Sequence, residues 1–143
     1  MALGVRPRVV IGAYERQSGL CPYCMEPVTD RNATWEHIIP RSWGGPENGR
    51  NTFLACEPCN ALKSEVESFI SNAFDKQTTL TTRVALFILH CGVRFRTHKK
   101  KTTVWKMRYF RMSHHILEMT DYHMNHMADD IPELKGNLRH KFF

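Results

Sequence analysis

The 143-residue sequence has no long hydrophobic run, no internal repeat and no low-complexity segment. Its longest apolar run, 84–89, is far shorter than the roughly 20 apolar residues that a membrane-spanning helix needs. The N-terminus lacks a basic region followed by an apolar core, so we expect no secretory signal and a cytoplasmic location. With 42% hydrophobic and 24% charged residues, the composition is typical of one globular domain rather than a disordered chain.

Acidic residues are missing from one long stretch of a chain that is basic overall. The formal net charge is +6 and the pI is about 9.2, which suits a polyanionic partner. Between residues 94 and 111 there is no acid, and aromatic residues alternate with basic ones. Two interpretations stay open: a surface that grips DNA, or a solvated face over core aromatics. The basic residues are Arg94, Arg96, Lys99, Lys100, Lys101, Lys106, Arg108 and Arg111.

Four of the five cysteines form two Cys-x-x-Cys pairs, Cys21 with Cys24 and Cys56 with Cys59. Two such turns supply the four soft ligands of a tetrahedral Zn²⁺ site, with each sulfur about 2.3 Å from the ion. A lone pair could be redox-active, but two pairs that each contain a proline favour one shared zinc. Because a closed four-cysteine site has no open position, we expect this zinc to be structural. Cys91 lies in an apolar stretch, where we expect a small buried residue.

The pattern of apolar and turn-forming residues predicts a mixed α and β fold. Strands are expected over 34–39 and 51–55, separated by a loop over 43–50 that contains three glycines and a proline. Residues 1–20 are expected to be a short lead-in to the first cysteine pair. Helices are expected over 81–91 and 112–128, joined by a basic hairpin that turns near residues 99–101.

A further helix is expected to begin at residue 60, directly after the second cysteine pair. Its apolar residues fall at helical spacing and should face the core. These residues are Leu62, Val66, Phe69 and Ile70.

The 31 residues between the two cysteine pairs exceed an ordinary zinc-ribbon linker, so we expect an insertion with a function of its own. Glu36 and His37 are adjacent near the end of the first strand. In a strand they point to opposite faces, but at a strand end the chain can twist so that both border one site. Asn60 and Lys63 are three residues apart and share a face of the following helix.

This arrangement resembles the HNH endonuclease family, whose site is a ββα-metal finger. The resemblance rests on the acid–His pair, the paired glycines 44–45, an Asn at the second strand and an Asn at the helix start, flanked by two Cys-x-x-Cys knuckles. It covers about residues 18–70. The implied fold is a small zinc-stapled ββα finger over 1–75, with a mostly helical, basic extension over 76–143 in the same compact unit.

The resemblance implies a role for each matching residue. His37 corresponds to the general base that activates water, and Asn51 to the residue that orients that base and its loop. Asn60 corresponds to a metal ligand of the catalytic centre, as does Glu36, which stands where Asp is commoner. Such oxygen ligands suit Mg²⁺ or Mn²⁺. Arg41 and Lys63 are expected to hold flanking phosphates.

The family resemblance therefore predicts an enzyme that hydrolyses phosphodiester bonds, mainly of double-stranded DNA, with one structural Zn²⁺ and one catalytic ion. We expect a monomer or homodimer, with phage or host proteins as further partners, and a bacterial host cell if a phage encodes the protein. The competing hypothesis is a non-catalytic zinc-ribbon module that binds DNA or protein. It has no need for the pair of His37 and Asn60.

Overall fold

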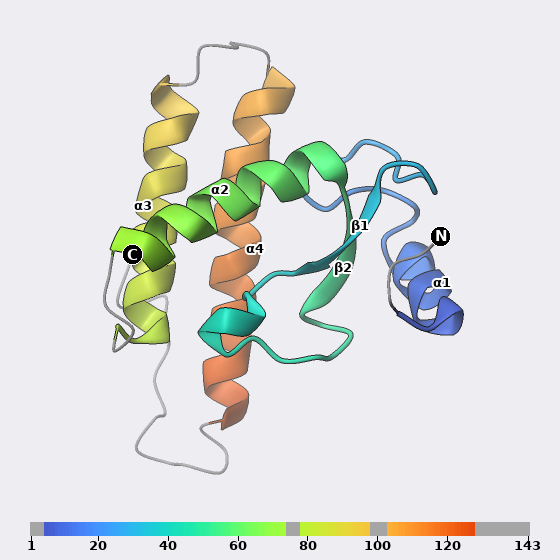
Figure 1. The fold of residues 1–143 in the computed structure, drawn as a ribbon, viewed down its shortest axis with the longest axis horizontal. Helices are drawn as coiled ribbons and strands as arrows, with labels where there is room; N and C mark the ends of the chain where they lie inside the picture. The colour runs from blue at the N-terminus through green and yellow to red at the C-terminus, as the bar shows by residue number, and fades with distance from the viewer. Residues whose placement is uncertain (1–4, 74–77, 98–102, 128–143) are drawn as a thin grey trace.

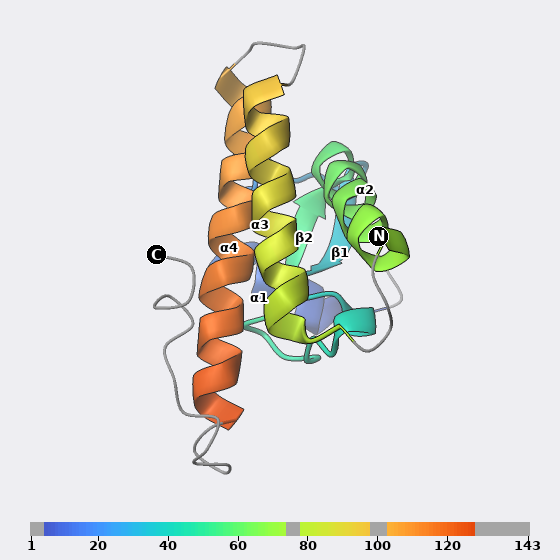
Figure 2. The same cartoon turned by 90° about the vertical axis from the view of Figure 1, so that its left-hand side faces the viewer.

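The computed structural model describes residues 5–73, 78–97 and 103–127. Its elements in chain order are α1 (Pro7–Arg16), β1 (Ala33–His37), a short 3-10 helix (Arg41–Trp43), β2 (Thr52–Cys56), α2 (Glu57–Ala73), α3 (Leu80–Thr97) and α4 (Thr103–Met127). The α3 and α4 helices run side by side as one layer, and the two-stranded sheet with α2 lies against it (Figures 1 and 2). The expected α+β class is confirmed.

The two strands form an antiparallel hairpin whose ends carry the site residues. Ala33 pairs with Cys56 at one end of the ladder and His37 with Thr52 at the other. The expected strands were shifted by only a residue or two, because Pro40 and the glycine-rich loop mark where pairing must stop. The hairpin therefore brings the acid–His pair of β1 beside the start of β2, and β2 runs directly into α2.

The α2 helix begins at the second cysteine pair and covers the sheet with one face. Cys59, Lys63, Val66 and Ile70 are buried on that face. The expectation that Phe69 faces the core is wrong, because this residue is 53% exposed. At roughly 100° per residue it lies on the flank of the buried face, where its ring stacks on His90 of α3 at 4.5 Å.

The C-terminal part is more helical than expected. Both flanks of the predicted basic hairpin belong to helices α3 and α4, while its turn at residues 98–102 lies outside the described residues. Cys91 is buried as expected, together with Val84 and Phe87 of α3. The predicted lead-in contains a helix that was not expected, α1, which occupies half of its 20 residues. Among the described helices, none combines the length and apolar character needed to cross a membrane.

Aromatic contacts fasten this helical layer to the finger. The Trp43 ring meets the Phe87 ring edge to face at 6.2 Å, and its indole nitrogen donates to Ser71 Oγ at 2.9 Å. At the other end, the Arg50 guanidinium lies 4.4 Å from the centre of the Tyr122 ring of α4. The loop that carries the candidate site is therefore held against both C-terminal helices.

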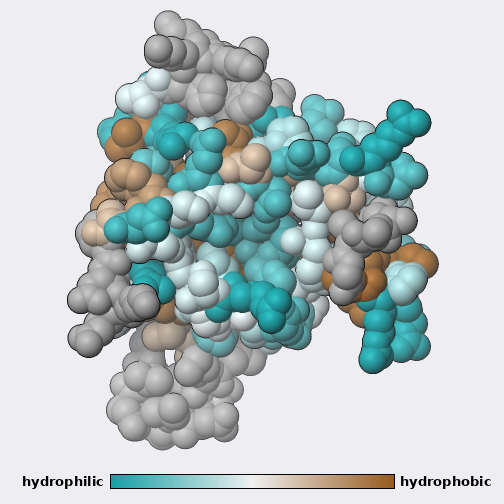
Figure 3. Space-filling model, in the orientation of Figure 1, coloured by the Kyte–Doolittle hydropathy of each residue, from teal (hydrophilic) through white to brown (hydrophobic). Residues whose placement is uncertain are grey.

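The face seen in Figure 1 is mainly hydrophilic across its centre, and hydrophobic residues gather near its edges over α1 and α3 (Figure 3). Large exposed apolar residues of these helices include Ile11, Tyr14, Leu89 and Val93. The hydrophilic centre covers α2 and the loop beside it.

We expect Phe87→Ala to lower the free energy of unfolding by about 3–5 kcal/mol, because it removes a fully buried ring that contacts Trp43. Chemical denaturation followed by circular dichroism measures this loss. The matched control is Leu89→Ala on the same helix, which is 66% exposed and should cost less than about 0.5 kcal/mol. Equal stabilities of the two variants would show that α3 does not pack on the finger.

Candidate metal-binding and catalytic site

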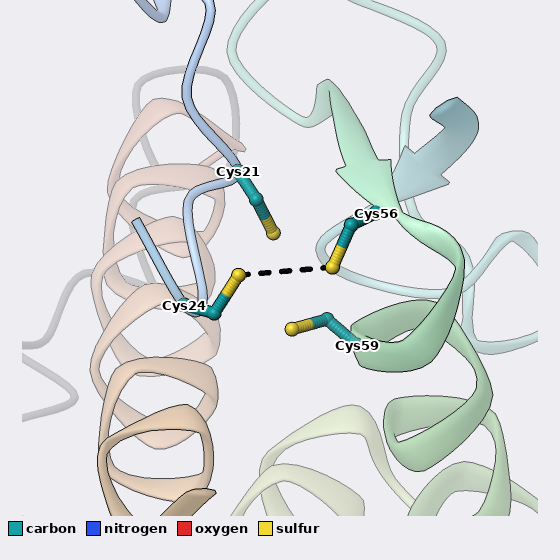
Figure 4. Close-up of side chains that lie close together, drawn as sticks. All are labelled: Cys21, Cys24, Cys56 and Cys59. Carbon is teal, nitrogen blue, oxygen red and sulfur yellow. Dashed lines mark hydrogen bonds between the residues drawn. The ribbon is translucent and has the colours of Figure 1, made fainter. Parts of the chain in front are cut away.

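The four paired cysteines converge on one point, as expected. Their sulfur atoms all lie within 4.8 Å of one another, and the Sγ atoms of Cys24 and Cys56 are 3.7 Å apart (Figure 4). Four sulfurs bound tetrahedrally at about 2.3 Å from a zinc ion are about 3.8 Å apart. The geometry of the thiols therefore suits a Zn²⁺ ion.

The ionisation of the four thiols in this cluster also favours a bound cation. Hydrogen bonds with Cys56 and Cys59 lower the pKa of the Cys21 thiol, whereas hydrogen bonds with Cys21 and Cys56 raise the pKa of the Cys59 thiol. The Cys21 thiolate is thus stabilised, while ionisation of the neighbouring Cys59 thiol is made less favourable. A divalent ion compensates this repulsion and allows all four to bind as thiolates.

The α4 helix supports the first knuckle. His115 hydrogen-bonds through Nε2 to the carbonyl of Pro22 at 3.1 Å, and its ring packs edge to face with the buried ring of Tyr23. This contact was not predictable from the sequence, because His115 lies more than 90 residues further along the chain. The C-terminal helix is therefore part of the cluster's surroundings.

A shallow pocket of about 290 Å³ lies where the end of β1 meets α2. Glu36 and His37 line it from the strand, Arg41 from the 3-10 helix, and Asn60 and Glu67 from α2. The structure thus places four of the predicted site residues around one pocket. Glu67 was not predicted.

Asn51 holds the loop beside this pocket. Its fully buried amide accepts from the backbone N–H of Ile39 at 2.8 Å and donates to the carbonyls of Ile39 and Pro46 at 3.1 and 3.0 Å. These bonds join the chain just after His37 to the loop that follows it. Asn51 therefore fixes the backbone on which His37 stands.

His37 has a carboxylate partner that the sequence analysis missed. Its Nε2 lies 2.7 Å from Glu47 Oε1, and the same oxygen accepts from Arg41 Nε at 3.1 Å. Because an ionised carboxylate only accepts, Nε2 carries a proton in this bond and the neutral ring keeps its lone pair on Nδ1. The only available signal was that Glu47 is the one acid in the 43–50 loop.

Lys63 does not lie on the DNA-facing surface that the sequence analysis expected. Its side chain is fully buried, and Nζ contacts Glu36 Oε1 at 2.7 Å and Glu67 Oε1 at 2.6 Å. It also donates to the carbonyl of His37 at 3.0 Å. A phosphate cannot reach an ammonium that is enclosed in this way, so the expected phosphate contact is wrong.

The same cluster sets the ionisation of its members. Burial raises the pKa of the Glu36 carboxyl to about 7, although the nearby Lys63 ammonium counteracts the shift. Burial lowers the pKa of Lys63, but attraction to Glu36 and Glu67 outweighs that effect and the pKa is raised. Lys63 therefore stays protonated and compensates the carboxylates of the buried Glu36 and the half-buried Glu67.

Comparisons with known proteins bear on this segment. Residues 21–76 match the family described as HNH endonuclease. This matched range, residues 21–76, is called the HNH segment below. The CRISPR-associated endonuclease Cas9 of Corynebacterium diphtheriae is 40% identical over 50 residues, which are 34% of this chain and 5% of that protein. No solved structure matches.

Outside the HNH segment, the basic residues of 94–111 do not form one exposed set. Arg108 is buried, so the expectation that it faces DNA is corrected, while Arg94 is half-buried and bonded to Glu65 and His90. Arg96 is exposed, whereas Lys106 is half-buried with its ammonium 5.9 Å from the centre of the Phe95 ring. Lys99, Lys100 and Lys101 lie outside the described residues.

Cys59→Ser should abolish stoichiometric zinc, because one of four converging thiolates is lost. Cys91→Ala is the matched control, since Cys91 is buried away from the cluster and should leave one zinc per chain. Atomic absorption on protein purified without added metal gives the zinc content. Full zinc in Cys59→Ser would contradict a four-cysteine site.

Asn51→Ala should lower the free energy of unfolding by roughly 3 kcal/mol, because the buried carbonyl and N–H of Ile39 and the part-buried carbonyl of Pro46 lose their partner. Thermal unfolding monitored by circular dichroism tests this expectation. Asn72→Ala, an exposed position on α2, should leave the stability nearly unchanged. A small effect at position 51 would mean that its amide does not hold the loop.

Proposed function

We propose that this protein is a metal-dependent endonuclease that hydrolyses phosphodiester bonds of DNA, mainly double-stranded DNA. The observation that carries the proposal is the convergence of Glu36, His37 and Asn60 on one pocket within the HNH segment. A binding module has no need to bring an imidazole, a carboxylate and an amide together. The matched residues span only 5% of the Cas9 protein, so the activity and substrate of the whole chain are proposed and are not taken over from that relative.

His37 is the general base in this proposal. An imidazole is suited to take up a proton near neutral pH. With Nε2–H donating to Glu47, the lone pair on Nδ1 is the one that accepts a proton from the attacking water. The bond from Lys63 to the His37 carbonyl and the bond from the Ile39 N–H to Asn51 hold the backbone that carries the ring.

Glu36 and Asn60 are the proposed ligands of the catalytic ion. Their carboxylate and amide oxygens are the hard donors that Mg²⁺ and Mn²⁺ prefer, whereas the zinc cluster offers only sulfur. When bound there, the ion supplies charge neutralisation at the scissile phosphate and at the leaving 3′ oxygen.

Arg41 is placed to hold a phosphate of the same strand. Its side chain is 73% exposed at the rim of the pocket, and Glu47 orients it. We extend the proposed DNA-binding surface to Arg96, Lys106 and the lysines at 99–101. One site of this kind cuts one strand, so a monomer should nick DNA and a double-strand break needs a second copy or a partner.

The test is to incubate zinc-loaded protein with supercoiled plasmid in Mg²⁺, in Mn²⁺ and in EDTA. We expect nicking that depends on the metal and falls at least a hundredfold in His37→Ala, because the base is lost. His114→Ala, an exposed histidine on α4, is the control and should keep full activity. Plasmid binding without cleavage in any metal would favour a zinc-ribbon binding module, and nicking that survives in His37→Ala would place the chemistry elsewhere.

A further inference from the structure

The buried ammonium of Lys63 occupies the interior side of the pocket that is proposed to take a divalent ion. We propose that Lys63 is a positioning residue whose ammonium neutralises and holds the Glu36 carboxylate until the divalent ion binds. Once the ion has bound to Glu36, the Glu67 carboxylate neutralises the charge of Lys63. This inference rests on the proposed catalytic ion at Glu36. It assigns Glu67 a role that the HNH resemblance did not include.

The contacts of Nζ leave the ammonium no further donor. An ammonium has three N–H groups, and its three partners are Glu36 Oε1 at 2.7 Å, Glu67 Oε1 at 2.6 Å and the His37 carbonyl at 3.0 Å. The Phe87 ring lies 5.9 Å from Nζ. Lys63 is therefore built into the site as a fixed positive charge, with no hydrogen left for a phosphate.

The two carboxylates differ in their access to solvent. The Glu36 side chain is almost completely buried, whereas that of Glu67 is 20% exposed, and both line the pocket with Asn60. When ionised, they carry two negative charges against the single positive charge of Lys63. With both carboxylates ionised, the cluster of Glu36, Glu67 and Lys63 has a net charge of −1, which favours a cation.

An ion bound at Glu36 weakens the electrostatic attraction between the Glu36 carboxylate and the Lys63 ammonium. An ammonium that is buried without a carboxylate partner is strongly unfavourable, because its lost hydration is not replaced. Glu67 provides that partner, one turn further along α2 and already at 2.6 Å. The exchange of partners therefore needs no new contact for Lys63.

The competing explanation is a static buried ion pair that only stabilises the fold. It predicts that neutralising Glu67 changes stability and weakens metal binding only by the loss of one nearby negative charge, whether or not Lys63 is present. The exchange predicts weaker metal binding, because Lys63 then has only Glu36 as a carboxylate partner and the ion must compete with it.

The experiment measures Mn²⁺ binding to the zinc-loaded full chain by electron paramagnetic resonance of the free ion. We expect Glu67→Gln to weaken Mn²⁺ binding at least tenfold. Glu65→Gln is the matched control, because Glu65 lies on the same helix, is 60% exposed and pairs with Arg94 instead. Its Mn²⁺ affinity should stay within twofold of the wild type. Zinc content and melting temperature check that both variants are folded.

A second variant keeps the inference testable if Glu67→Gln folds poorly. In Lys63→Met the counter-cation is gone, so Mn²⁺ should raise the melting temperature of this variant more than that of the wild type. Equal Mn²⁺ affinities in wild type and Glu67→Gln, or no Mn²⁺ binding by the wild type, would overturn the inference. Normal Mn²⁺ binding with the expected Glu67→Gln loss but no DNA cleavage would instead overturn the proposed nuclease activity.

Discussion

The convergence of four cysteine sulfurs on one point is the constraint on which the rest of the finger depends. Cys21 and Cys24 come from the turn after α1, Cys56 ends β2, and Cys59 lies in the first turn of α2. One ion bound to all four fixes where the strand stops and the direction in which the helix leaves. The position of the proposed catalytic pocket, between the end of β1 and α2, follows from that junction.

Buried polar side chains then set the fine geometry of the pocket. Asn51 joins the loop to the backbone after His37, and Lys63 joins the carbonyl of His37 to Glu36 and Glu67. Each is fully buried, and each makes three polar contacts at most 3.1 Å long. Such networks are favourable only when every member is satisfied, so they leave the site few alternative arrangements.

The predictable features were those encoded by local spacing. The cysteine pairs, both strands and, to within three residues, the start of α2 at Glu57 follow from ligand spacing, proline and glycine. Helix α1 was missed because Val9, Val10 and Ile11 favour strands and Gly12 disfavours helix, and the burial of Val10 and Ala13 decides the outcome. Lys63 was misplaced because lysine is usually exposed. Only the folded chain brings two carboxylates and a carbonyl around its ammonium.

The most direct test of the account is to identify the ends left on an end-labelled DNA duplex after incubation with the zinc-loaded protein and Mg²⁺. Water activated by His37, with the 3′ oxygen as the leaving group, predicts cleavage of one strand with 5′-phosphate and 3′-hydroxyl ends, and none in EDTA. Ends with a 3′-phosphate, or cleavage that persists without a divalent ion, would contradict the proposed chemistry of this pocket.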